Sequence, residues 1–235
     1  MSPNPAVLTW PRAAAGGFLP TDIPSLVAWY KADAITGVAD GANAATWPDS
    51  SGNAHHMSMG RKYLAAGANG LPCIEVNASN RFGAPGTFNM NGPKQSIIAV
   101  VYLAGGAQTQ CIASPTGTGA FDLGFNSSGQ PYFGFYSAAP SGAQSAAVLA
   151  QTTWGIVGGS YSDAANLLAV RLDGAQTTAS TTYSTSNARG LGFAGWPNGG
   201  AKLVGRIAEI IYYYATLTAQ QFADVEGYLA DKNGI

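Results

Sequence analysis

Residues 205–235 read GRIAEIIYYYATLTAQQFADVEGYLADKNGI, and this closing stretch decides the fold. Its first ten residues are rich in isoleucine and tyrosine, which is typical of a buried β-strand. Thr218 followed by Gln221 has the spacing of a capping box, which predicts that a helix begins there. One apolar face of that helix is formed by Phe222, Val225 and Leu229. We therefore expect a core strand followed by a short amphipathic helix.

Short strands separated by glycine-rich turns are predicted along the rest of the chain. One hairpin pairs 121–125 with 132–136 around the turn 126–130, and another follows 167–172 at Asp173-Gly174. Further strands are expected at 25–30, 73–77, 95–103, 154–161 and 202–214. The sequence thus predicts an all-β fold, a two-sheet antiparallel jelly-roll sandwich with one short C-terminal helix.

Composition excludes several classes of function. Only 10% of the 235 residues are charged, the net charge is −1, and no lysine or arginine cluster occurs, so nucleic-acid binding is not expected. No apolar run is long enough to cross a membrane, and the N-terminus lacks the pattern of a secretory signal. No nucleotide-binding loop is present. A weakly charged surface suits a protein in an assembly or one that touches neutral sugar, but it is also common in secreted sandwiches.

Residues 1–24 are predicted to form a proline-rich N-terminal arm, with 25–235 as the sandwich domain. Prolines at 3, 5, 11, 20 and 24 remove backbone donors and favour extended chain. Such an arm either frays or docks on a neighbouring molecule. Trp10 and Phe18 are the candidate partner-docking residues within it.

Four motifs occur in an order that resembles one known family. They lie at Leu26–Tyr30 (LVAWY), Trp47–Asn53 (WPDSSGN), Arg171–Gly174 (RLDG) and Gly205–Tyr213 (GRIAEIIYY). Together they resemble the laminin-G-like domains of phage and bacterial proteins, within the concanavalin A-like superfamily. The resemblance implies two antiparallel sheets with a concave face. It implies no single activity, because this superfamily includes lectins, hydrolases, lyases and structural modules.

The carboxylates do not suggest catalysis. Glycoside hydrolysis needs two carboxyl groups roughly 5 to 9.5 Å apart. The glutamates are Glu75, Glu209 and Glu226, and none has an acidic neighbour two or four residues later. We therefore assign no catalytic residue and expect a protein that is not an enzyme.

Six residues are assigned structural roles: Trp29, Trp47, Asp49, Glu209, Thr218 and Phe222. Glu209 lies between Ile207 and Ile211 on its strand, which predicts a buried position. A lone buried charge is costly, so we expect Glu209 to accept hydrogen bonds from backbone N–H groups, Arg206 or Arg171.

No metal ligand or cofactor is assigned. Asp49 could ligate Ca²⁺ at a sandwich rim, although turn aspartates more often bond to their own backbone. His55 and His56 are adjacent in a loop, and we expect both to lie at the surface rather than to bind a metal or act as a catalytic base. Cys73 and Cys111 lie in apolar surroundings and are expected to be buried free thiols, with a disulfide as the alternative.

Exposed aromatic rings are the remaining candidates for ligand binding, because sugar rings stack on them. Tyr132 and Tyr136 alternate onto one face of their strand, and Trp196 and Asn198 lie in the loop sequence 193–198. These residues form the candidate glycan-binding set. The competing interpretation is that the aromatic rings are packed in the core or on a sheet face.

Two functions fit the sequence. The first is a structural bacteriophage virion component, such as a capsid decoration, head-fibre or tail-associated protein, attached through residues 1–24 and present as a homo-oligomer or as arrayed copies. Its location would be the virion, without export by a signal peptide. The alternative is an extracellular carbohydrate-binding module or adhesin. The two overlap, because a virion protein can also bind surface polysaccharide.

Overall fold

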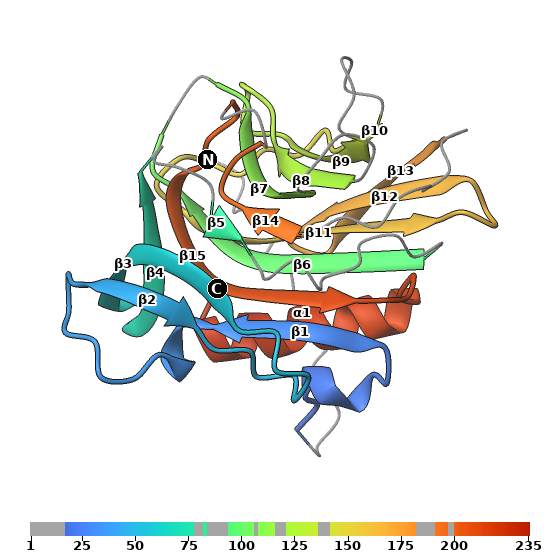
Figure 1. Cartoon of the computed structure of the whole chain (residues 1–235). Helices are drawn as coiled ribbons and strands as arrows, with labels where there is room; N and C mark the ends of the chain where they lie inside the picture. The colour runs from blue at the N-terminus through green and yellow to red at the C-terminus, as the bar shows by residue number, and fades with distance from the viewer. Residues whose placement is uncertain are drawn as a thin grey trace, which may run out of the picture.

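Two layers of antiparallel strands face each other across a common core in this computed structural model (Figure 1). The structure describes residues 17–77, 82–83, 94–105, 108–115, 121–135, 142–181, 191–196 and 200–235. Hydrogen bonds connect the strands in the order β10-β9-β8-β7-β14-β5-β3-β4-β15-β6-β11-β12-β13. This arrangement is the predicted two-sheet β-sandwich.

The layer next to the helix, which we call the lower layer, is centred on β15 and β6 (Figure 1). Its strands are β1 (Leu26–Lys31), β4 (Leu71–Asn77), β6 (Lys94–Leu103), β11 (Trp154–Ser162), β12 (Leu167–Leu172), β13 (Ala175–Ser180) and β15 (Val204–Tyr213). Strands β1 and β4 both pair with β15, at opposite ends of it.

The upper layer is smaller and lies over the opposite side of the core (Figure 1). Its strands are β5 (Phe82–Gly83), β7 (Gln110–Pro115), β8 (Phe121–Phe125), β9 (Pro131–Phe135), β10 (Gly142–Gln144) and β14 (Leu191–Phe193). The long strand β3 (Met57–Ala68) pairs with both β4 and β5 and so joins the two layers, while β2 (Asn43–Trp47) pairs with β3. Short 3-10 turns span Pro20–Asp22 and Ala32–Ala34.

Strand β15 is buried on both faces because each face meets a different cluster. Ile207, Ile210 and Tyr212 belong to the sandwich core between the layers. Ile211 and Tyr213 belong to a second cluster under the helix, which we call the helix-side cluster. The continuous apolar run at this strand follows directly from burial on both sides.

Helix α1 (Ala219–Asn233) covers the outer face of the lower layer (Figure 1). The Thr218 hydroxyl accepts a hydrogen bond from the Gln221 N–H at 3.2 Å, and the Gln221 side chain accepts one from the Thr218 N–H at 2.9 Å. Gly234 ends the helix in the left-handed conformation, at φ 64°. Burying a side chain such as Phe222 contributes about 1.5–3 kcal/mol. The predicted capped helix is confirmed, and it is not long and apolar enough to cross a membrane.

Both predicted hairpins are confirmed. Strands β8 and β9 pair from Phe121↔Phe135 to Phe125↔Pro131, and β12 and β13 pair around Asp173-Gly174. Asp173 and Gly174 have φ values of 46° and 84°, as a tight two-residue hairpin turn requires.

Phe18 has intermediate exposure, and its partner-docking role stays a prediction. It packs against the helix-side cluster of its own chain. The neighbouring segment is anchored as well, because Ile23 is buried and the Pro20 carbonyl accepts a hydrogen bond from the Tyr213 hydroxyl at 3.1 Å. Trp10 lies outside the described residues.

Candidate functional site

The outer face of β8 and β9, on the far side of the upper layer from the core, carries one of the predicted aromatic residues. Along β8, Phe121 and Leu123 point into the sandwich core, so Asp122 and Gly124 point outward. On β9, Phe133 points inward and Tyr132 outward. Tyr132 is paired directly with Gly124, and the missing side chain there leaves room for its ring.

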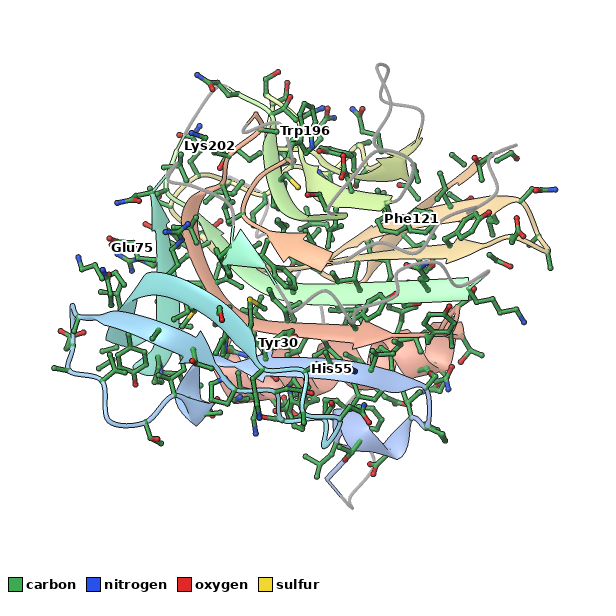
Figure 2. All side chains as sticks on the ribbon, viewed as in Figure 1. Tyr30, His55, Glu75, Phe121, Trp196 and Lys202 are labelled. Carbon is green, nitrogen blue, oxygen red and sulfur yellow. The ribbon has the colours of Figure 1, made fainter. Side chains whose placement is uncertain are left out.

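Trp196, in the segment that follows β14, joins Tyr132 on this face. Trp196 lies close enough to Tyr132 to affect its ionisation: burial raises the pKa of Tyr132, nearby Cys111 and Asp122 raise it further, and Trp196 opposes these effects. Figure 2 shows Trp196 on the upper layer, on the side away from helix α1. Two of the four predicted glycan-binding residues are therefore brought together by the fold.

The two aromatic residues are partly exposed, but their polar atoms are not. Tyr132 and Trp196 both have intermediate exposure. The Tyr132 hydroxyl and the Trp196 indole nitrogen are each buried. What these two side chains expose is therefore carbon. A platform of exposed ring carbon on an otherwise polar face is the surface on which a sugar ring stacks.

Glycine forms the floor beneath this platform. A Cβ at Gly124 would lie 3.0 Å from the Tyr132 hydroxyl and 2.3 Å from the Gln110 carbonyl oxygen. At Gly142 on β10, a Cβ would lie 2.4 Å from the Phe133 carbonyl oxygen. Larger residues do not fit at either position, and at Gly124 the Tyr132 hydroxyl lies close to the sheet.

Amide side chains flank Tyr132 on the same face. Gln144 is exposed, lies opposite Tyr132 across the β9–β10 pair, and donates to the Gln130 side-chain oxygen at 3.0 Å. Asn126 donates to that same oxygen at 2.9 Å. Amides offer both donors and acceptors, as sugar hydroxyls require. The sequence analysis did not predict these three amides. The one feature of the sequence that could have indicated them is the turn Asn126–Gln130, which directly precedes the strand of Tyr132.

The other predicted binding residues, Tyr136 and Asn198, lie outside the described residues. Their relation to Tyr132 and Trp196 therefore stays a prediction.

Each of the three glutamates forms an ion pair, and the three lie on different elements. Glu75 meets Lys62 at 3.4 Å, Glu226 meets Arg171 at 2.7 Å, and Glu209 meets Lys232 at 2.7 Å. Lys232 also reaches Asp33, at 3.1 Å. The arrangement neutralises each carboxylate locally and supports structural roles for them.

The predicted partners of Glu209 were wrong, although its buried position is confirmed. Its carboxylate accepts hydrogen bonds from the Trp29 indole at 2.5 Å and from Lys232 at 2.7 Å. A β-bulge follows Ile207, so Glu209 points to the helix side with Ile211, whereas Ile207 points into the core. Burial raises the pKa of Glu209, and Lys232 and Trp29 oppose that effect.

Asp49 organises the loop that follows β2. One carboxylate oxygen accepts from the backbone N–H groups of Trp29 and Ser51, both at 2.9 Å. The other accepts from the Ser51 hydroxyl at 2.7 Å and the His55 N–H at 3.0 Å. The His56 ring accepts from the Asp49 N–H at 3.1 Å. Both oxygens thus already bind protein donors, in the structural role that the turn sequence predicts.

Candidate metal ligands are scattered in the described ranges, where no three His, Cys, Asp or Glu side chains gather closely enough to hold a metal ion. Cys73 and Cys111 are both buried free thiols, as predicted. Burial raises the pKa of Cys73 to about 11; Arg206 opposes this effect, and Glu75 and Asp40 add to it.

The fold and this face define a jelly-roll β-sandwich that carries an aromatic platform on one outer sheet surface. No protein-family profile and no curated protein sequence matches the chain. Solved structures do match it, over most of its length and at low sequence identity.

Domain 4 of AbnA, a GH43 extracellular arabinanase from Geobacillus stearothermophilus solved in complex with arabinotriose, is one such structure. It is 16% identical, with a TM-score of 0.62, and the match covers 86% of this chain and 98% of that one. Trypanosoma rangeli sialidase is 13% identical, with a TM-score of 0.60 over 89% of this chain. The chain spans about a third (33%) of the length of the sialidase.

A mutant of HCR D/C VPI 5995 also has this fold. It is 11% identical, with a TM-score of 0.64, and the match covers 90% of this chain and 53% of that chain. At such identities the likeness establishes the fold.

Proposed function

We propose that this protein is a non-catalytic carbohydrate-binding domain of the laminin-G-like type, in which Tyr132 and Trp196 stack neutral sugar rings. The observation that carries the proposal is the pairing of these two side chains on one sheet face with their polar atoms buried and ring carbon exposed. Exposed aromatic carbon binds the apolar face of a sugar, and the flanking amides of Gln130 and Gln144 supply hydrogen bonds to its hydroxyls.

The similar structures support this proposal. The match to Domain 4 of AbnA extends over nearly the whole of that domain, which was solved in complex with arabinotriose. The low charge of the chain favours a neutral ligand, because only 10% of its residues are charged. The glutamate ion pairs support a domain that binds sugar without cleaving it, since none of the three carboxylates is paired with another.

The test is calorimetric titration of the wild type with neutral oligosaccharides, including arabinotriose, beside Trp196→Ala. Losing the stacked indole should weaken binding about tenfold. Trp154→Ala is the matched control, because Trp154 lies on the lower layer and should leave this binding unchanged. The proposal fails if no neutral oligosaccharide from a broad array binds, or if Trp196→Ala binds as tightly as the wild type.

The virion hypothesis finds no support among the similar structures reported above. It stays a prediction, as do its attachment through residues 1–24, its virion location and the extracellular alternative. A carbohydrate-binding domain is compatible with either location.

A further inference from the structure

A row of partly exposed side chains crosses the outer face of the lower layer, on the opposite side of the sandwich from Tyr132 and Trp196. The strand register places each member directly opposite the next, through the pairs Lys62↔Glu75, Glu75↔Arg206, Arg206↔Tyr102 and Tyr102↔Trp154. We call these five residues the cross-strand row. Adjacent strands lie about 4.8 Å apart, so the row spans roughly 19 Å, the length of a short oligosaccharide.

All members of the row point away from the core. Their neighbours along the strands, such as Tyr63, Ile74, Val101 and Ile207, belong to the sandwich core, and side chains alternate between the two faces. Each of the five has intermediate exposure. Glu75 is labelled in Figure 2, at the side of the molecule where β4 lies. The row is therefore a surface feature of the large sheet, next to helix α1.

Aromatic contacts organise one half of the row. The rings of Tyr102 and Trp154 have centroids 5.5 Å apart at an angle of 50°. The guanidinium of Arg206 lies 5.1 Å from the Tyr102 ring centroid, in a cation–π contact. Trp154, Tyr102 and Arg206 thus form a continuous stacked group across three strands.

Arg206 makes no hydrogen bond or ion pair with any described residue. Among the described residues it contacts the Tyr102 ring through its guanidinium. In the other half of the row, Glu75 is already paired with Lys62 at 3.4 Å. Within the described part of the chain, nothing occupies the five N–H donors of Arg206, which leaves them to a ligand. Its planar fork matches a carboxylate, to which arginine binds through two parallel hydrogen bonds.

We propose that the cross-strand row is a second saccharide-binding site, specific for a sugar that carries a carboxylate. Arg206 binds the carboxylate, and the Tyr102 and Trp154 rings support the adjoining sugar rings. The charges agree with this assignment, because Lys62 and Arg206 against Glu75 leave one net positive charge on the row. The site is distinct from the Tyr132–Trp196 platform, so its failure and the failure of the proposed function can be told apart.

The experiment titrates the full chain with oligogalacturonate and alginate oligosaccharides, and with methyl-esterified oligogalacturonate, which lacks the charge. In Trp196→Ala, where the neutral-sugar platform is weakened, the acid forms should bind about tenfold or more tightly than the ester, as a charge-assisted hydrogen-bond pair requires. Arg206→Gln and Trp154→Ala should each lose about tenfold or more in affinity for the acid forms. Trp196→Ala is the matched control and should keep this binding, while its binding of neutral oligosaccharides weakens about tenfold.

A second measurement keeps the test decisive if Arg206→Gln unfolds. Oligogalacturonate should change the fluorescence of Trp154, so the signal should persist in Trp196→Phe and disappear in Trp154→Phe. Arg206→Lys keeps the charge without the fork and should bind several-fold more weakly than the wild type. The proposal is overturned if the ester binds Trp196→Ala as tightly as the acid does, if neither acid form binds, or if an oligo-aspartate peptide competes equally well.

Discussion

The buried ion pair between Arg171 and Glu226 attaches helix α1 to the β12–β13 hairpin, and removing Glu226 should be strongly destabilising. The carboxylate accepts hydrogen bonds from Arg171 Nε at 2.7 Å and Nη2 at 2.8 Å. The two side chains are only 8% and 1% exposed. Breaking a buried pair by deleting one partner costs about 3–5 kcal/mol, because the other charge stays buried.

The remaining contacts of Arg171 place the expected cost in the lower part of this range. After Glu226→Ala, the guanidinium would keep its hydrogen bonds to the Gln176 side chain at 2.7 Å and the Gly174 carbonyl at 3.0 Å, and its contact with the Phe222 ring. We therefore expect a loss of about 3–4 kcal/mol. For a chain of this size, about 2–4 °C of Tm accompanies each kcal/mol, so Tm should fall by about 6–16 °C.

Urea unfolding and thermal scans of wild type and Glu226→Ala measure this loss. Glu75→Ala is the matched control: its ion pair with Lys62 is partly exposed, with side chains 44% and 28% accessible, and should contribute no more than about 1 kcal/mol. The double variant Arg171→Met/Glu226→Leu should be more stable than Glu226→Ala, because it leaves no unpaired charge. The reasoning is refuted if Glu226→Ala loses less than about 1 kcal/mol.

Three further predictions concern the cap, the core and the thiols. Thr218→Ala removes the helix cap and should cost about 1 kcal/mol in urea unfolding, whereas Thr218→Ser should be close to neutral; equal losses would contradict the capping role. Gly159→Ala places a Cβ 2.2 Å from the Phe133 ring and should cost about 1–3 kcal/mol, while Gly158→Ala, whose nearest atom would be 3.4 Å away, should cost much less. Cys73 is buried with its pKa raised to about 11, so folded protein should resist iodoacetamide at pH 8 until urea unfolds it. Rapid alkylation of the native protein would contradict the buried position of Cys73. Because the folded state holds the Cys73 thiol proton more tightly than the unfolded state does, the free energy of unfolding should fall as the pH rises from about 9 through 11.

The parts of the fold that the sequence predicts are those in which local pattern and tertiary packing agree. Strand β15 and helix α1 carry strong signals because the same apolar residues that favour the local structure are buried by the sandwich. The Asp173-Gly174 turn is legible because its positive φ values suit few other residue pairs.

Strands β3, β7 and β10 escaped prediction because their sequences contain few β-branched and aromatic residues. Strand β3 reads MSMGRKYLAAGA, and its strand character depends on pairing with β2 and β4, which are separate in sequence. Strand β13 was predicted only as the second arm of the Asp173-Gly174 hairpin. Its own sequence, AQTTAS, consists of small or polar residues that are partly or fully exposed, because this strand ends the path of paired strands.

The candidate site was predicted in part. Tyr132 is recognisable as an outward-facing residue because alternation along its hairpin is regular, and Trp196 because a lone tryptophan follows a turn sequence. Their contact and their flanking amides depend on which strands become neighbours. The cross-strand row is invisible in the sequence for the same reason, because Lys62 and Trp154 lie far apart in the chain and meet in one row only through strand register.

The most direct test of the central claim is nuclear magnetic resonance of the isotopically labelled chain during titration with a neutral oligosaccharide such as arabinotriose. The account predicts that the largest shift changes fall on the backbone amides of Tyr132, Gly124 and Gln144 and on the Trp196 indole. Resonances of Trp154 and Arg206 should stay unchanged in the same titration. Saturable shifts confined to another surface, or no shifts with any neutral oligosaccharide, would contradict the claim that the upper-layer face binds carbohydrate.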